Sequence, residues 1–200
     1  MISGLISLSL SLSVAQADLS IQKTADAVTN PSVTSSSTGK HIVTYDITSR
    51  GTIYGDLVEF RKIVTETLND SRGWNRANVS FQPVSTGAQM HIILASPASV
   101  KAASPTGCSE KLSCRVGSLV LINDDRWRLG SDSYNELGVS LLNYRQMVVN
   151  HEVGHFLGHG RIETCTTSTG LAPIMLQQST GLRGCSPNTW PLPSELWVSL

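Results

Sequence analysis

Residues 141–156 constrain the fold most, because their apolar side chains form two separate stripes at helical spacing. A helix that is apolar on two sides is expected at the centre of a domain, where other elements cover it. The polar side chains that this burial would enclose need partners, since an unpaired buried polar group is costly. The two stripes contain Leu141, Tyr144, Val148, His151 and His155, and Leu142, Val149, Val153 and Phe156.

The enclosed polar residues are His151, Glu152 and His155, in the pattern H-E-x-x-H. Residues four apart lie on one helix face, so both imidazoles can bind one metal ion, and zinc is the expected cofactor. Glu152 lies about 100° around the helix from His151, beside such a metal and not on it. It is therefore the candidate catalytic residue, a general base and acid. The alternative is a core helix whose histidines bond to backbone groups and carboxylates.

A catalytic zinc normally keeps a third protein ligand, and the segment after the helix leaves that ligand open. Arg161 is excluded, because a guanidinium has no acceptor atom. His159 is the nearest candidate, provided that the helix ends at Gly158 and the chain turns back. Glu163 has more reach and a suitable carboxylate, and a water molecule is the third possibility.

The stretches "HEVGHFLG" and "APIM" (172–175) resemble the active-site helix and the Met-turn of metzincin zinc peptidases. The longer run from Ser113 to Pro191 is similar to a family of secreted actinobacterial proteins described only as metzincin-like peptidases of unknown function. Metzincins place a His or Asp ligand at the position of Arg161. The resemblance implies an α+β, zincin-like fold: a twisted mixed sheet packed on the buried helix, then a Met-turn loop containing Met175. It also implies a substrate along an edge strand, with residues 116–123 as the strand beside the cleft.

The remaining chain supplies elements compatible with this fold. Strands are predicted at 41–48, 79–84, 89–95 and 116–123 from their β-rich composition, and a helix at 56–70 from the spacing of Leu57, Phe60, Val64 and Leu68. Residues 124–140 show no period and are expected to be irregular. Two hundred residues suit one domain of ordinary size, which we place at 41–200.

The N-terminus and the cysteines indicate export. Residues 1–17 are interpreted as a signal peptide, with Ala15-Gln16-Ala17 before the cleavage point and Asp18 as the first mature residue. Residues 18–40 form a Ser/Thr-rich linker. An even number of cysteines in an exported chain favours disulfides, and the local pairing Cys108–Cys114 and Cys165–Cys185 is favoured over the two others.

Lys+Arg and Asp+Glu both number 15, so the formal net charge is zero. Nucleic acid and stable membrane insertion after signal cleavage are therefore not expected, and the chain is predicted to be a monomer. We expect a secreted or cell-envelope zinc endopeptidase that hydrolyses peptides or proteins. Two alternatives remain: an impaired pseudo-protease that acts as a binding module in the cell envelope, and a zinc hydrolase of cell-wall amide bonds.

Overall fold

The computed structural model describes Met1, residues 39–165 and residues 170–200. The predicted signal peptide and nearly all of the predicted linker lie outside the described residues. None of the helices in the described part of the chain is long and apolar enough to cross a membrane.

Within the described ranges, five strands form one mixed sheet with the order β2-β1-β3-β5-β4. β1 is parallel to both β2 and β3, and β5 is parallel to β3. β4 is antiparallel to β5 and forms one edge of the sheet. The strands are β1 (His41–Arg50), β2 (Val79–Pro83), β3 (Met90–Ala95), β4 (Cys114–Val116) and β5 (Leu119–Asn123). The expected α+β class with a mixed sheet is confirmed.

The period-two alternation of the strands places one apolar cluster on each face of the sheet. Ile92 and Ile122 belong to the larger cluster, which also contains Phe60 and Val149 from the helices α1 (Leu57–Asn69) and α5 (Leu141–Phe156). Ile93 and Leu121 face the opposite cluster, with Val100 of α2 (Pro97–Ala103). Strands β3 and β5 are therefore covered on both faces, which explains their apolar runs at residues 92–95 and 120–122.

Two predictions about local structure are wrong, and one helix was not predicted. Residues 116–123 are not one strand: Gly117, with φ of 57°, turns the chain between β4 and β5. The segment 124–140 is not irregular throughout, because it contains α3 (Asp124–Leu129) and α4 (Asp132–Asn135). Helix α2 was not expected, although Ser96 caps its first turn and Pro97 begins it. Single-turn and two-turn helices are too short to show a hydrophobic period.

Three 3₁₀ turns complete the described elements: η1 (Trp74–Ala77), η2 (Gln178–Thr180) and η3 (Pro193–Glu195). Both predicted disulfides are present, Cys108–Cys114 and Cys165–Cys185. The first joins β4 to the loop before it, and the second joins two parts of the chain that follows α5.

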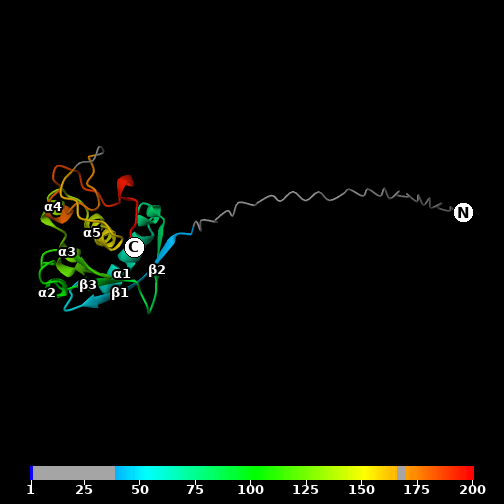
Figure 1. Ribbon diagram of the computed structural model, residues 1–200, viewed down its shortest axis with the longest axis horizontal. Helices are drawn as coiled ribbons and strands as arrows, with labels where there is room; N and C mark the ends of the chain where they lie inside the picture. The colour runs from blue at the N-terminus through cyan, green and yellow to red at the C-terminus, as the bar shows by residue number, and fades with distance from the viewer. Residues whose placement is uncertain (2–38, 166–169) are drawn as a thin grey trace, which may run out of the picture. The chain divides into compact units, whose positions relative to one another are not determined.

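Helix α5 is buried from Met147 to Gly154, as its two apolar stripes predicted, whereas Leu142 of the second stripe is exposed. The side chain of Ser140 accepts a hydrogen bond from the amide of Asn143 and caps its first turn. In the view of Figure 1, α5 lies between the strands and the orange-to-red chain after residue 170. Its second half therefore faces protein on several sides, and this half carries H-E-x-x-H.

Candidate functional site

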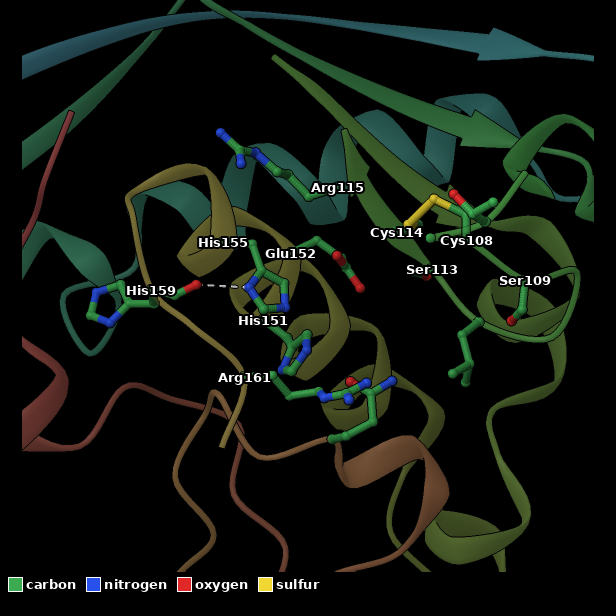
Figure 2. A pocket seen from close by; sticks show the side chains of 14 residues that line it. Cys108, Ser109, Ser113, Cys114, Arg115, His151, Glu152, His155, His159 and Arg161 are labelled. Atoms are coloured by element: carbon green, nitrogen blue, oxygen red, sulfur yellow. Dashed lines mark hydrogen bonds between the residues drawn. A yellow bond between two sulfur atoms is a disulfide. The ribbon is translucent and has the colours of Figure 1, made fainter. Parts of the chain in front are cut away.

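The last two turns of α5 bring His151, Glu152 and His155 to one pocket. The two imidazole rings lie 4.8 Å apart between centroids and nearly perpendicular, at 87°. The His151 and Glu152 side chains are buried, and His155 is partly exposed. Figure 2 shows both rings and the Glu152 carboxylate around the same open space. The helix spacing thus places these three groups together, as the sequence predicted.

Hydrogen bonds fix the protonation pattern of both rings. His151 Nδ1 lies 2.8 Å from the carbonyl of Ile174, and His155 Nδ1 lies 2.8 Å from the carbonyl of His159. A carbonyl can only accept, so each Nδ1 carries the hydrogen and each neutral ring keeps its lone pair on Nε2. By hydrogen-bond geometry, His151 Nε2 is buried without a partner among the described residues, and the Gln177 side chain is near enough to raise the pKa of this ring. Such an orphaned acceptor indicates a site for a ligand that accepts electron pairs.

Burial shifts the charges of the site toward neutrality. Burial, together with the positive charge of a protonated His155, lowers the pKa of His151 to about 4. Burial also lowers the pKa of His155, and the guanidinium groups of Arg115 and Arg161 add to that effect. Burial raises the pKa of Glu152 to about 8. Both imidazoles are therefore neutral near pH 7, the form in which histidine binds a metal, while Glu152 holds a proton unless a cation lies nearby.

The pocket has a volume of about 510 Å³ and a polar lining. One side is formed by Cys114 and Arg115 of β4, with the Cys108–Cys114 disulfide at the rim. Arg161 lines the pocket from the loop after α5. The resemblance pointed to residues 116–123 as the strand beside the cleft, and the structure assigns that place to β4. Because β4 is an edge strand of the sheet, no other strand of the described residues pairs with its outer backbone groups.

The turn at 172–175 lies directly against α5. The carbonyl of Ile174 accepts the hydrogen of His151 Nδ1. The amides of Ile174 and Met175 both donate to the carboxylate of Glu195 at 2.9 Å.

Gly154 lies where the turn meets the helix. A Cβ atom at Gly154 would overlap the Met175 sulfur and come within 2.8 Å of Trp74. Gly154 is thus the residue that lets the turn approach the helix so closely. Neither Gly154 nor Glu195 was singled out in the sequence, because each contributes through contacts distant along the chain.

The imidazole ring of His159 does not lie beside the rings of His151 and His155. Its Nε2 donates to the carbonyl of Trp197 at 2.9 Å, and its ring packs against the indoles of Trp197 and Trp74 at centroid distances of 3.8 and 4.8 Å. Figure 2 shows the ring directed away from His151 and His155. To reach a metal held by the pair, it would have to leave both indoles and the Trp197 carbonyl.

The other candidate ligand is also elsewhere. Glu163 is exposed and paired with Arg161, whose Nε lies 2.5 Å from the carboxylate. Within 39–165 and 170–200, no group of three His, Cys, Asp or Glu side chains is placed to hold a metal ion. The site thus offers two imidazole nitrogens and a neighbouring carboxyl group, without a third protein ligand in this conformation.

The family model for "Protein of unknown function (DUF3152)" matches residues 15–186. The chain belongs to this family. The matched range includes H-E-x-x-H, Arg161, the turn at 172–175 and all four cysteines, and it ends before residues 192–199. No match was found among curated proteins.

Proposed function

We propose that this protein is an exported zinc-dependent peptidase in which His151 and His155 bind the metal and Glu152 transfers protons. One observation supports this most strongly: the buried Nε2 of His151 has no partner among the described residues, although its Nδ1 is firmly bonded. Carbonyl bonding of the far nitrogen is the usual support of metal-binding histidines. The donor atoms are those that zinc prefers, so the residues present fit the ion.

Bound zinc would supply Lewis-acid activation of a water molecule and of a substrate carbonyl. Glu152 would accept a proton from the attacking water and deliver it to the leaving amine. Its burial holds it in the protonated form when no cation is near, and a neighbouring dication favours the carboxylate that a base requires. The partly exposed His155 and the open pocket give a polypeptide access to these groups.

The substrate that we propose is a peptide lying along β4. The edge strand borders the pocket that contains Glu152, so an extended peptide paired with β4 would pass beside the proposed metal. Export is supported by the two disulfides, which persist in oxidising compartments.

A specific observation favours a second candidate. Arg161 lines the pocket, and its positive charge opposes a cation there. With two protein ligands and a nearby guanidinium, zinc affinity would be low, and the same pocket could bind peptides without cutting them. This is the pseudo-protease alternative, a binding module of the cell envelope.

Zinc titration of the purified, chelator-treated protein tests the proposal. We expect one zinc per chain in the parent, a loss of binding in His151→Ala, and unchanged binding in His91→Ala. His91 is a matched control because it is also a histidine and pairs with Asp46 on the sheet. Incubation with unfolded proteins and with peptidoglycan fragments then separates peptidase activity from amide hydrolysis of the cell wall. A parent that binds no zinc would overturn the peptidase and leave the binding module.

A further inference from the structure

Both proposed ligand rings depend on carbonyl groups that lie outside α5. The Ile174 carbonyl holds the Nδ1 of His151, and the His159 carbonyl holds the Nδ1 of His155. A ring keeps its Nε2 lone pair directed at the pocket only while its own carbonyl stays in place. The contacts that hold these two carbonyls in place therefore decide how the two rings are oriented.

The Ile174 carbonyl is fixed from the C-terminal side. The carboxylate of Glu195 accepts the amides of Ile174 and Met175 at 2.9 Å and the amide of Leu192 at 2.8 Å. Glu195 is only 4 % exposed, so these three bonds satisfy a buried charge in a water-poor environment. One buried side chain thereby joins η3 to the turn beneath His151.

The loop that supplies the His159 carbonyl is fixed by the same stretch of chain. His159 donates its Nε2 hydrogen to the Trp197 carbonyl and packs on the Trp197 indole. Two residues further on, the amide of Ser199 donates to the carbonyl of Leu157 at 2.8 Å. Gly158 permits this approach, because a Cβ there would lie 2.6 Å from the Ser199 carbonyl oxygen.

We propose that residues 192–199, the C-terminal clamp, orient both histidines of the pocket, and that His159 is a positioning residue and not a metal ligand. Glu195 acts on His151 through Ile174, and Trp197 acts on His155 through His159. The two connections share no residue between the clamp and the rings, so each can be broken alone. The orientation of the rings does not require the proposed function, although its consequence for zinc binding rests on it.

The test is the tautomeric state of the two histidines in the metal-free protein, measured by nitrogen NMR above their pKa values. We expect Nδ1–H in both rings of the parent, the less common tautomer of free histidine. Glu195→Gln should convert His151 to a mixture and leave His155 unchanged. His159→Phe keeps a ring between the indoles but loses the donor, and should affect His155 alone.

Matched controls and rescue separate positioning from folding. Glu66→Gln and His41→Phe, at exposed positions, should change neither ring. His159→Gln places an amide donor near the lost Nε2 and should restore the parent tautomer of His155. If Glu195→Gln does not fold, Glu195→Asp retains the charge with a shorter reach and should give a weaker form of the same selective change.

Zinc titration adds a second measurement. Loss of a group that orients a histidine ligand typically weakens metal binding by about ten- to a hundred-fold, and we expect this of Glu195→Gln and His159→Phe. If one substitution changes the tautomers of both His151 and His155, or if the folded variants leave both tautomers unchanged, the clamp is refuted. If the tautomers respond as expected but no variant or parent binds zinc, the clamp stands and the proposed peptidase function fails.

Discussion

The inner face of α5 and the loop that follows it both carry histidines at a spacing of four residues, but their rings lie in different places. His151 and His155 are four residues apart, and so are His155 and His159. The first pair shares a pocket because the helix is intact between them, with ring centroids 4.8 Å apart. The helix ends at Phe156, and Gly158 takes a φ of 104°, so the third ring leaves the stripe and packs between two indoles. Equal spacing in sequence therefore places side chains together only where the helix continues.

The largest effect should come from the helix face. Glu152→Gln removes proton transfer while leaving both imidazoles, so we expect zinc binding to persist and turnover to fall by at least about 10²- to 10⁴-fold. Hydrolysis of an unfolded protein at equal zinc occupancy measures this. Glu66→Gln, the exposed control, should retain full activity. Turnover equal to the parent in Glu152→Gln would remove Glu152 from the mechanism.

Zinc affinity tests directly whether the helix face and the loop after it differ in metal binding. Truncation of a ligand on the helix face, as in His151→Ala, should weaken binding by more than about a hundred-fold, the upper range for loss of a supporting group. His159→Gln and Glu163→Ala change the loop and should each have less than a tenfold effect. Titration with a zinc-sensitive dye as competitor gives all three constants. If His159→Gln loses zinc as completely as His151→Ala, His159 is a ligand and the two regions belong to one site.

Helix α5 contains no cysteine, whereas the chain that follows it is cross-linked by Cys165–Cys185. Replacing Cys165 and Cys185 by Ser should destabilise the fold by about 3 kcal/mol in the chain-entropy model, because that disulfide spans 20 residues. The same change at Cys108 and Cys114, which are six residues apart, should cost about 2 kcal/mol. Denaturant unfolding with oxidised parent protein as reference measures both. Equal losses in the two pairs would show that loop length does not decide the stabilisation.

The pH dependence of stability tests the burial of Glu152 in the metal-free protein. Its pKa rises from the ordinary 4.5 to about 8 on folding, so the folded state binds more protons than the unfolded state between these values. The parent should therefore lose stability relative to Glu152→Gln as pH rises, by about 1.4 kcal/mol between pH 6 and 7. Unfolding titrations of both proteins at the two pH values measure the difference, in which the histidine contributions cancel. A constant difference would show that Glu152 is not buried in its protonated form.

Much of this protein could be predicted because the decisive signals are local. The period of residues 141–156 predicted a buried helix, the alternation of Val43, Tyr45 and Ile47 predicted the face of β1 that is buried, and the cysteine spacing predicted both disulfides. The position of Glu152 beside two histidines follows from 3.6 residues per turn. The helical period, the strand alternation and the place of Glu152 depend on neighbours within a few residues, and the disulfides could be predicted because four cysteines allow only three pairings. The sequence alone therefore determined these features.

Other features were decided only by tertiary structure. Glu195 binds the amide of Ile174, 21 residues away, and Trp74 packs on His159 from a segment much earlier in the chain. No periodic pattern marks either residue, because each finds its partner only after the sheet, α5 and the C-terminal chain have come together. The position of the His159 ring has the same cause. Beyond the end of the helix, the ring is placed by its contacts with Trp74 and Trp197. The sequence thus determined which residues share the helix face, and the packing of distant segments decided how those residues are held.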